Sequence, residues 1–144
     1  AAGNDGVNAL NETYTGNASA DLSNLLIVGS VNVNNAISSF SNRPGSACIG
    51  TCGTNNVNSM MNFWLVAPGE NIRGALVNGR VGTASGTSMA TPIVAGAAAL
   101  LWSTHPEWTY QQVKDRILST ARPVAGLETK VSTGGVLDLG AALQ

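Results

Sequence analysis

Charged residues are scarce in this sequence, and the few that occur do not cluster. Only 10% of the 144 residues are charged, with a net charge of −1, whereas about 25% of a typical soluble domain is charged. The seven basic residues are scattered from Arg43 to Lys130. A protein that binds nucleic acid needs several clustered Lys or Arg side chains to displace counterions from phosphates. The composition therefore argues against nucleic acid as a partner.

Long apolar runs and metal-ligating side chains are also few. The longest apolar run, residues 93–102, is interrupted by Gly96 and falls far short of the ~20 residues that span a bilayer. Two cysteines and one histidine cannot supply the four ligands of a structural zinc site, and no acidic run suits calcium. We therefore expect a buried helix rather than a membrane span, no metal and no cofactor.

The two cysteines are Cys48 and Cys52. They could form a disulfide that closes a small surface loop or remain as free thiols, and we favour the disulfide. Uncharged Asn, Ser and Thr supply most of the polarity, and Asn11 and Asn17 begin glycosylation acceptor tripeptides. The chain opens on Ala1 without an initiating Met or a leader, which indicates that a preceding segment has been removed. These features predict a secreted, cell-surface or periplasmic protein.

Two short apolar runs predict strands. Residues 25–31 are apolar, partly β-branched and bounded by polar clusters, which is typical of a strand buried on both faces of a parallel sheet. Residues 63–67 form a second such run, which Pro68 and Gly69 end. Polar loops are expected at 7–24 and 41–59, and the second is long for a compact domain. The length of the chain is compatible with a single core and one domain.

The second half of the chain predicts helices. After Gly82, small residues lead into a segment that is apolar all round, which places the helix in the centre of the protein. Proline is tolerated only near a helix start, so Pro92 indicates that this helix begins close to Ser88. Thr109 and Gln112 have the spacing of a capping box for a second helix. Asp138 is placed to cap a short final turn at 139–143.

A serine in the first turn of such a helix can serve as a nucleophile. The helix start offers unpaired backbone N–H groups and the positive end of the helix dipole, and both stabilise an oxyanion. Gly86 lets backbone approach just before Ser88, and Ala90 leaves space beside it. The alternative is that Ser88 or Thr87 merely caps the helix, as most Ser and Thr at such positions do.

Residues 86–96, with the sequence GTSMATPIVAG, resemble the nucleophile motif of the subtilisin-like serine proteases, the subtilases. Further segments resemble this family in the same order along the chain, and together they cover nearly all of it. These segments are 1–6, 38–45, 66–69, 99–109 and 135–138. The resemblance implies an α/β fold, a three-layer αβα arrangement with a mostly parallel sheet, of which this chain supplies the C-terminal part. Residues 1–144 would then be the C-terminal portion of a catalytic domain.

The resemblance also implies roles for particular residues. Ser88 would be the acylated nucleophile, and the Asn4 side-chain amide would bind the oxyanion together with the Ser88 backbone N–H. Ala1, Ala2 and Gly3 would line one wall of the substrate pocket. The alternative for these three is that they are ordinary small residues of a strand.

Two members of the expected triad are missing from this sequence. In the family the Asp and His precede the Asn strand, and here only three residues precede Asn4. The sole histidine, His105, follows Ser88 by 17 positions and matches a structural position of the family. A serine without a positioned base is a poor nucleophile. The chain alone is therefore expected to be inactive, and its implied partners are a polypeptide substrate and an upstream segment of the same protease carrying Asp and His.

Two departures from the family pattern stand out. Ile93 occupies a position where many members have a structural His, and the stretch 48–61 looks like an insertion. Two other hypotheses remain open: a non-catalytic interaction module that kept the fold, and a split enzyme whose second chain supplies Asp and His. We also expect the chain alone to leave a sheet edge and apolar helix faces uncovered, and therefore to self-associate.

Overall fold

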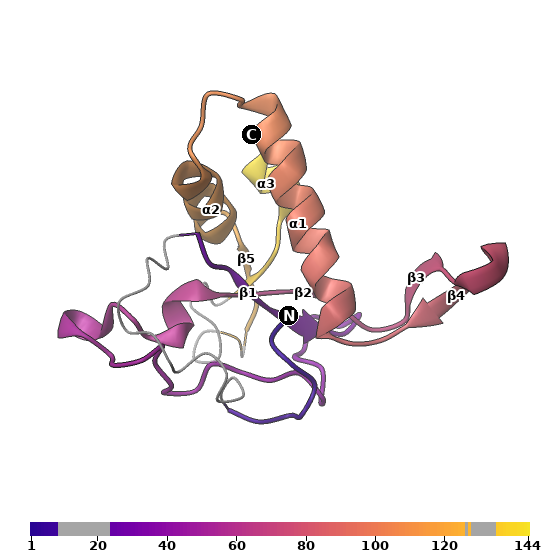
Figure 1. Ribbon diagram of the computed structural model, residues 1–144, viewed down its shortest axis with the longest axis horizontal. Helices are drawn as coiled ribbons and strands as arrows, with labels where there is room; N and C mark the ends of the chain where they lie inside the picture. Colours follow the sequence, from indigo (N-terminus) through magenta and orange to yellow (C-terminus); the bar gives the residue numbers. More distant parts are fainter. Residues whose placement is uncertain (9–23, 126, 128–134) are drawn as a thin grey trace.

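The computed structural model describes residues 1–8, 24–125, 127 and 135–144. Both acceptor tripeptides, at Asn11 and Asn17, lie outside these residues. The described chain forms a four-stranded sheet in the order β1 (Ile27–Val31), β2 (Trp64–Pro68), β6 (Gly135–Val136) and β5 (Arg122–Pro123). Helices α1 (Thr87–Thr104), α2 (Tyr110–Ser119) and α3 (Leu139–Ala142) lie on one side of this sheet, as Figure 1 shows.

The two predicted strands are confirmed, and they pair in parallel. β1 and β2 run in register from Ile27 opposite Trp64 to Val31 opposite Pro68. Every residue of β1 is buried, as the continuous apolar run predicts for a strand covered on both faces. β2 also pairs in parallel with β6, whereas β5 pairs antiparallel with β6 at the sheet edge. The expected α/β fold with a mostly parallel sheet is therefore present.

Side chains that alternate along the strands pack into two hydrophobic cores, one on each side of the sheet. On the helical side, Val28, Leu65 and Ala67 pack with buried residues of the three helices. On the other side, the strands meet residues of the long 41–63 loop instead of helices, and the buried residues there include Ile49, Met60 and Phe63. In the described part of the chain the sheet thus has one helical layer and one layer of irregular chain.

α1 begins at Thr87, which confirms the predicted start near Ser88. Pro92 is its sixth residue and has no N–H, so the Ser88 carbonyl lacks the usual partner four residues on. The prediction that this helix is buried all round is wrong for the described structure. One stripe packs on β1, β2 and α2, whereas Leu100 is 45% and Trp102 44% exposed. The described residues supply packing partners on one side only.

The predicted caps of the two later helices are present. Thr109 and Gln112 form a capping box at the start of α2, with the Thr109 hydroxyl accepting from the Gln112 N–H. The Asp138 side chain accepts from the Ala141 N–H and caps α3. No described helix is long and apolar enough to cross a membrane.

A hairpin, which the sequence analysis did not predict, precedes α1. Strands β3 (Ile72–Ala75) and β4 (Val81–Ala84) pair antiparallel, and the short 3-10 turn η4 (Val77–Gly79) joins them. The hairpin extends away from the sheet and the helices (Figure 1). The chain therefore reaches the start of α1 from this protruding arm.

The 41–63 loop contains the 3-10 turns η2 (Thr54–Asn56) and η3 (Met60–Phe63). Cys48 and Cys52 form a disulfide in it, which confirms the favoured alternative. Ile49, between the two cysteines, is only 3% exposed, and its N–H donates to the Asn58 carbonyl at 2.9 Å. The disulfide therefore closes a loop that inserts an apolar side chain into the core.

Candidate active site

Ser88 lies at the start of the helix in a strand–turn–helix unit. β4 ends at Ala84, Ser85 and Gly86 form the turn, and Ser88 is the second residue of α1. The Ser88 side chain is exposed, and neither its hydroxyl nor its backbone N–H has a hydrogen-bond partner among the described residues. Both groups are therefore available to a ligand at the positive end of the helix dipole.

Gly86 allows the chain to pass close to Asn4 just before Ser88. Its backbone angles, φ 156° and ψ 161°, lie in a region that only glycine adopts readily. A Cβ at this position would lie 3.3 Å from Asn4 Nδ2. The Gly86 N–H donates to the Gly69 carbonyl at 2.8 Å, which fixes the turn to the residue after β2.

Asn4 is oriented by Thr87 of α1. Its Oδ1 accepts from the Thr87 N–H at 2.9 Å and from the Thr87 hydroxyl at 3.0 Å. Because a backbone N–H can only donate, the oxygen of the Asn4 amide faces α1 and Nδ2 points away from Thr87. The Thr87 hydroxyl also accepts from the Gly3 N–H at 3.1 Å. The buried Thr87 thus binds both the backbone and the side chain of the Asn4 segment.

These contacts decide the capping alternative. The N-cap residue of α1 is Gly86, which makes no side-chain cap, and neither Thr87 nor Ser88 caps the helix. Asn4, from a distant part of the sequence, accepts the first helical N–H in their place. Ser88 is left with two unpaired donors beside the Asn4 amide. This arrangement can stabilise negative charge on a carbonyl oxygen that the Ser88 hydroxyl attacks.

A hollow of about 330 Å³ lies beside Ser88. One wall is the hairpin β3–β4 and the other is the first turns of α1, with Ser88, Met89 and Pro92. Apolar side chains, among them Ile72 and Leu76, make up much of its lining. The hairpin therefore adds a surface to the site that the sequence analysis did not include.

The three small residues before Asn4 lie beside β1. The Ala2 N–H donates to the Val28 carbonyl at 2.9 Å, and the Ala2 side chain is 2% exposed, within the core. Ala1 is exposed and Gly3 is half-buried with a φ of +100°. Ala2 as a whole therefore offers almost no surface to a substrate.

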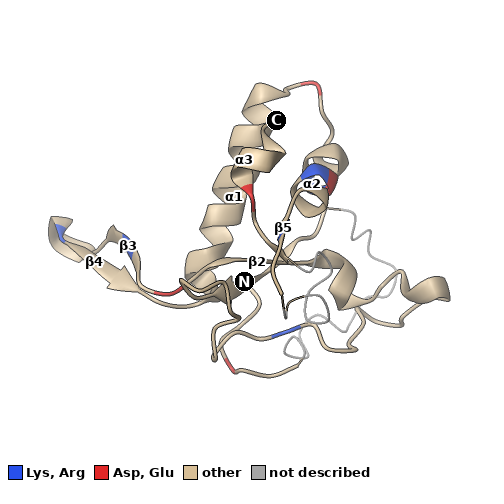
Figure 2. Ribbon diagram, turned by 180° about the vertical axis from the view of Figure 1, so that it is seen from behind, with Lys and Arg blue, Asp and Glu red and all other residues tan. Residues whose placement is uncertain are grey.

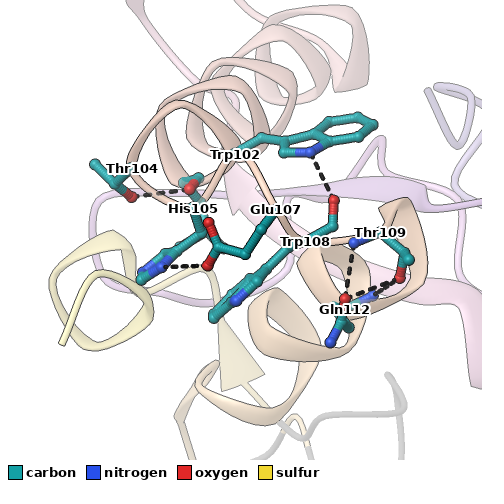
Figure 3. A network of polar contacts seen from close by, with 8 residues as sticks. Trp102, Thr104, His105, Glu107, Trp108, Thr109 and Gln112 are labelled. Carbon is teal, nitrogen blue, oxygen red and sulfur yellow. Dashed lines mark hydrogen bonds and ion pairs between the residues drawn. The ribbon is translucent and has the colours of Figure 1, made fainter.

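The sole histidine is far from Ser88. His105 is the C-terminal cap of α1, so the helix separates the two residues by about 25 Å at 1.5 Å per residue. Its ring stacks on Trp108 with centroids 4.1 Å apart, and its Nδ1 lies 3.6 Å from Glu107 Oε1 (Figure 3). The Trp102 Nε1–H donates to the Trp108 carbonyl at 2.9 Å, which joins α1 to the turn before α2. These contacts give His105 a structural role, as its position in the sequence suggested.

Charged side chains are sparse across the described part of the chain (Figure 2). In the described residues, no three His, Cys, Asp or Glu side chains come close enough to hold a metal ion. The site is thus built from neutral donors: a serine hydroxyl, backbone N–H groups and one amide.

The sequence analysis missed the residues that hold Asn4. Thr87 binds Asn4 over a separation of 83 positions, and Asn42 binds Asp5 over a separation of 37. Local sequence patterns do not predict contacts between residues so far apart. The hairpin did leave a signal, because the dipeptide Asn78-Gly79 is typical of a tight β-turn.

Comparison with known proteins places the chain in a family. The Subtilase family profile matches residues 1–138. Subtilisin NAT of Bacillus subtilis subsp. natto is 42% identical over 121 residues, which cover 84% of this chain and 27% of that protein. The subtilisin of Bacillus pumilus is 40% identical over 121 residues, covering 84% of this chain and 38% of that protein.

Solved structures agree with this assignment. The prenylagaramide maturation protease PagA matches with a TM-score of 0.73 and 30% identity, over 99% of this chain and 47% of that one. The self-cleaved protease domain of PatA matches with a TM-score of 0.70 and 31% identity, over 99% of this chain and 46% of that one. The chain thus spans less than half the length of these relatives. In sequence and in fold, it belongs to the subtilase family.

Proposed function

We propose that Ser88 is the nucleophile of a serine endopeptidase that hydrolyses peptide bonds through an acyl-enzyme. The Asn4 Nδ2 and the Ser88 backbone N–H bind the oxyanion. The observation that carries this proposal is the pair of hydrogen bonds from Thr87 to Asn4 Oδ1, which leaves the amide nitrogen pointing away from Thr87 while Ser88 keeps both donors unpaired. Membership of the subtilase family supports the same chemistry.

The proposed reaction has two steps. The Ser88 Oγ attacks the scissile carbonyl carbon, its proton passes to a base, and the C–N bond breaks as that base protonates the leaving amine. Water then hydrolyses the Ser88 ester and restores the hydroxyl. The negative oxygen of each tetrahedral intermediate accepts from Asn4 and from the Ser88 N–H, which are held in place before the reaction begins.

The base is the part of this mechanism that the chain does not contain. We propose that a histidine and its orienting aspartate come from an upstream segment of the same protease, and that residues 1–144 are the C-terminal portion of its catalytic domain. Two observations support this. His105 lies at the far end of α1, and the chain covers only 27% of subtilisin NAT and 47% of PagA.

The exposed face of α1 supports the same proposal. Leu100 and Trp102 are almost half exposed on a helix that is otherwise apolar and small in side chain. The remainder of a catalytic domain would cover this face and bury them. In the isolated chain, a second copy covers it instead, so the chain self-associates.

The proposed substrate is a polypeptide. The segment Ala1, Ala2 and Gly3 is the proposed wall of the pocket for the side chain before the scissile bond. Ala1 and Gly3 have the exposed surface of this segment, because Ala2 is only 2% exposed. Secretion is proposed on two grounds: the relatives named subtilisin and the disulfide, which persists in oxidising compartments.

A fluorophosphonate probe tests the assignment, because it phosphonylates only an activated serine. The full-length protease is expected to be labelled at Ser88, and the Ser88→Ala variant is expected to lose the label. Ser85→Ala is the matched control, since Ser85 is an exposed serine three positions away whose Oγ only accepts from the Asn71 N–H. Residues 1–144 alone should react no faster than a denatured control. A folded full-length protein that is not labelled at Ser88 would refute the proposal.

The competing function is a non-catalytic interaction module. The observation that favours it is the lack of any histidine near Ser88 in this chain. The sequence upstream of residue 1 separates the two, because an Asp and a His in subtilase context there would remove this alternative. A split enzyme makes a different prediction, in which a second polypeptide co-purifies and restores labelling.

A further inference from the structure

Asn42 binds the Asn4 segment through contacts separate from those of Thr87. It follows β1 in the long loop, and its side chain is only 2% exposed. Its Oδ1 accepts from the Asp5 N–H at 2.9 Å and from the Val7 N–H at 3.2 Å. A buried amide with this many backbone partners fixes the path of the segment that it binds.

Two further hydrogen bonds extend the same contact. The Asn42 backbone N–H donates to the Gly3 carbonyl at 3.0 Å, and Nδ2 donates to Asp5 Oδ2 at 3.4 Å. A Cβ on Gly3 would lie 2.6 Å from Asn42 Nδ2, so only glycine lets the two segments come this close. Asn42 therefore holds the backbone immediately before and immediately after Asn4.

Asn4 is thus fixed at two points by two different parts of the chain. Thr87 of α1 sets the direction of its side-chain amide, and Asn42 sets the position of its backbone. If the backbone moved while Oδ1 stayed bound to Thr87, the amide would pivot about Oδ1 and Nδ2 would take a new position relative to Ser88. Misplacement of a catalytic group by about 1 Å costs on the order of 10²-fold in rate.

We propose that Asn42 is a positioning residue for transition-state stabilisation, acting through Asn4. The inference rests on the proposed role of Asn4 and Ser88 and goes beyond it, because Asn42 touches neither the substrate nor the reacting atoms. Its effect falls on kcat, since the oxyanion forms only in the transition state. A purely structural residue would instead lower the amount of folded enzyme and leave the turnover of each folded molecule unchanged.

The test is a double-mutant cycle in the full-length protease with Asn42→Ala, Asn4→Ala and the double variant. Active sites are counted by fluorophosphonate titration, so that kcat refers to folded enzyme, and kcat and KM are measured on a peptide anilide. Asn42→Ala is expected to lower kcat about tenfold and to change KM less than about twofold. The expected fall in kcat is smaller than the roughly 10²–10³-fold fall that loss of the oxyanion donor itself causes in a subtilisin. In the Asn4→Ala background the same substitution is expected to change kcat less than about twofold.

Two controls complete the experiment. Asn62→Ala removes an exposed amide in the same long loop, one that donates to the Asn56 carbonyl, and is expected to leave kcat unchanged. The exchange Asn42→Asp with Asp5→Asn keeps an acceptor for both backbone N–H groups and reverses the side-chain bond, so it is expected to restore kcat to within about threefold of wild type.

The outcomes are distinguishable. Equal losses from Asn42→Ala in both backgrounds, or an unchanged kcat, would overturn the inference while leaving the function of Ser88 intact. Failure of the wild-type protein to titrate at Ser88 would instead overturn the proposed function. If Asn42→Ala gives no titratable enzyme, the cycle is run with Asn42→Ser, whose shorter side chain cannot reach both N–H groups. Loss of titratable enzyme in both variants would make Asn42 a residue of the fold and end the proposal.

Discussion

At the scale of single residues, Thr87 connects the two halves of the site. It is fully buried, and its hydroxyl accepts from Gly3 and donates to Asn4 while its N–H donates to Asn4 as well. A hydroxyl can do both because it carries one donor and two acceptor sites. Thr87, next to Ser88 in the sequence, therefore orients the amide that we propose as an oxyanion donor.

Substitution of Thr87 by Val tests this role, because Val has a similar shape and no hydroxyl. Thr87→Val in the full-length protease is expected to lower kcat about tenfold and the free energy of unfolding by about 1–3 kcal/mol, since the Gly3 N–H loses its acceptor. Thr87→Ser, which keeps the hydroxyl, should recover most of the activity. Steady-state kinetics on titrated enzyme and thermal unfolding measure the two effects. Thr104→Val, at the far end of the same helix, is the control, and an equal loss there would contradict the prediction.

The sequence predicted some of the site and not the rest, for a physical reason. Ser88 and Asn4 could be predicted because each lies in a short motif that can be recognised within the local sequence, and their catalytic roles stay a prediction. Thr87 was considered only as a cap, and Asn42 was not singled out. Their partners lie 83 and 37 positions away, and hydrogen bonds over such separations follow from the packing of the whole fold.

At the scale of elements, local signals again decided which parts were predictable. The capping box of α2, the Asp138 cap of α3 and the apolar runs of β1 and β2 can be recognised within a few residues, and all are confirmed. The hairpin was missed although its turn has positive φ at both Asn78 and Gly79. Its strands are exposed and short of apolar alternation, so only the turn residues could have indicated it.

The disulfide belongs to this scale because it fixes the form of one loop. Replacing both Cys48 and Cys52 by Ala is expected to lower the free energy of unfolding by about 2 kcal/mol, the loop-closure estimate for so short a ring. That loss corresponds to a fall in Tm of about 4–8 °C for a domain of 150–250 residues, and the fall is smaller in a larger catalytic domain. Calorimetry on the full-length protease measures it, with the exposed Thr51→Ala as control. An unchanged Tm would show that Ile49 keeps its place in the core without the disulfide.

At the scale of the whole molecule, the outward face of α1 is the main irregularity. A helix with apolar residues all round is normally buried all round, yet here Leu100 and Trp102 face solvent. The apolar pattern alone predicts a helix that is covered all round. The uncovered helix faces were expected only from the family resemblance, which implied that this chain is part of a larger catalytic domain.

Self-association of residues 1–144 follows from that exposure. Sedimentation at micromolar concentration should show dimers or larger species. Leu100→Lys should raise the dissociation constant at least about tenfold, because a dimer buries the exposed part of Leu100 from both copies and each is worth about 1 kcal/mol. Val33→Lys, at a position 93% exposed, is the matched control and should have no effect. A monodisperse monomer of residues 1–144 would contradict the expectation, and so would equal effects of the two lysines.

Pro92 has a consequence for how this protein can change. Because the Ser88 carbonyl has no helical partner at position 92, the first turn of α1 depends on Asn4 and Gly69 for its placement and less on the helix that follows. We therefore expect substitutions at deep positions such as Val94 and Leu101 to change mainly thermal stability, and substitutions in the Asn4 segment to change mainly the proposed catalytic rate. The two properties would then depend on different stretches of the chain.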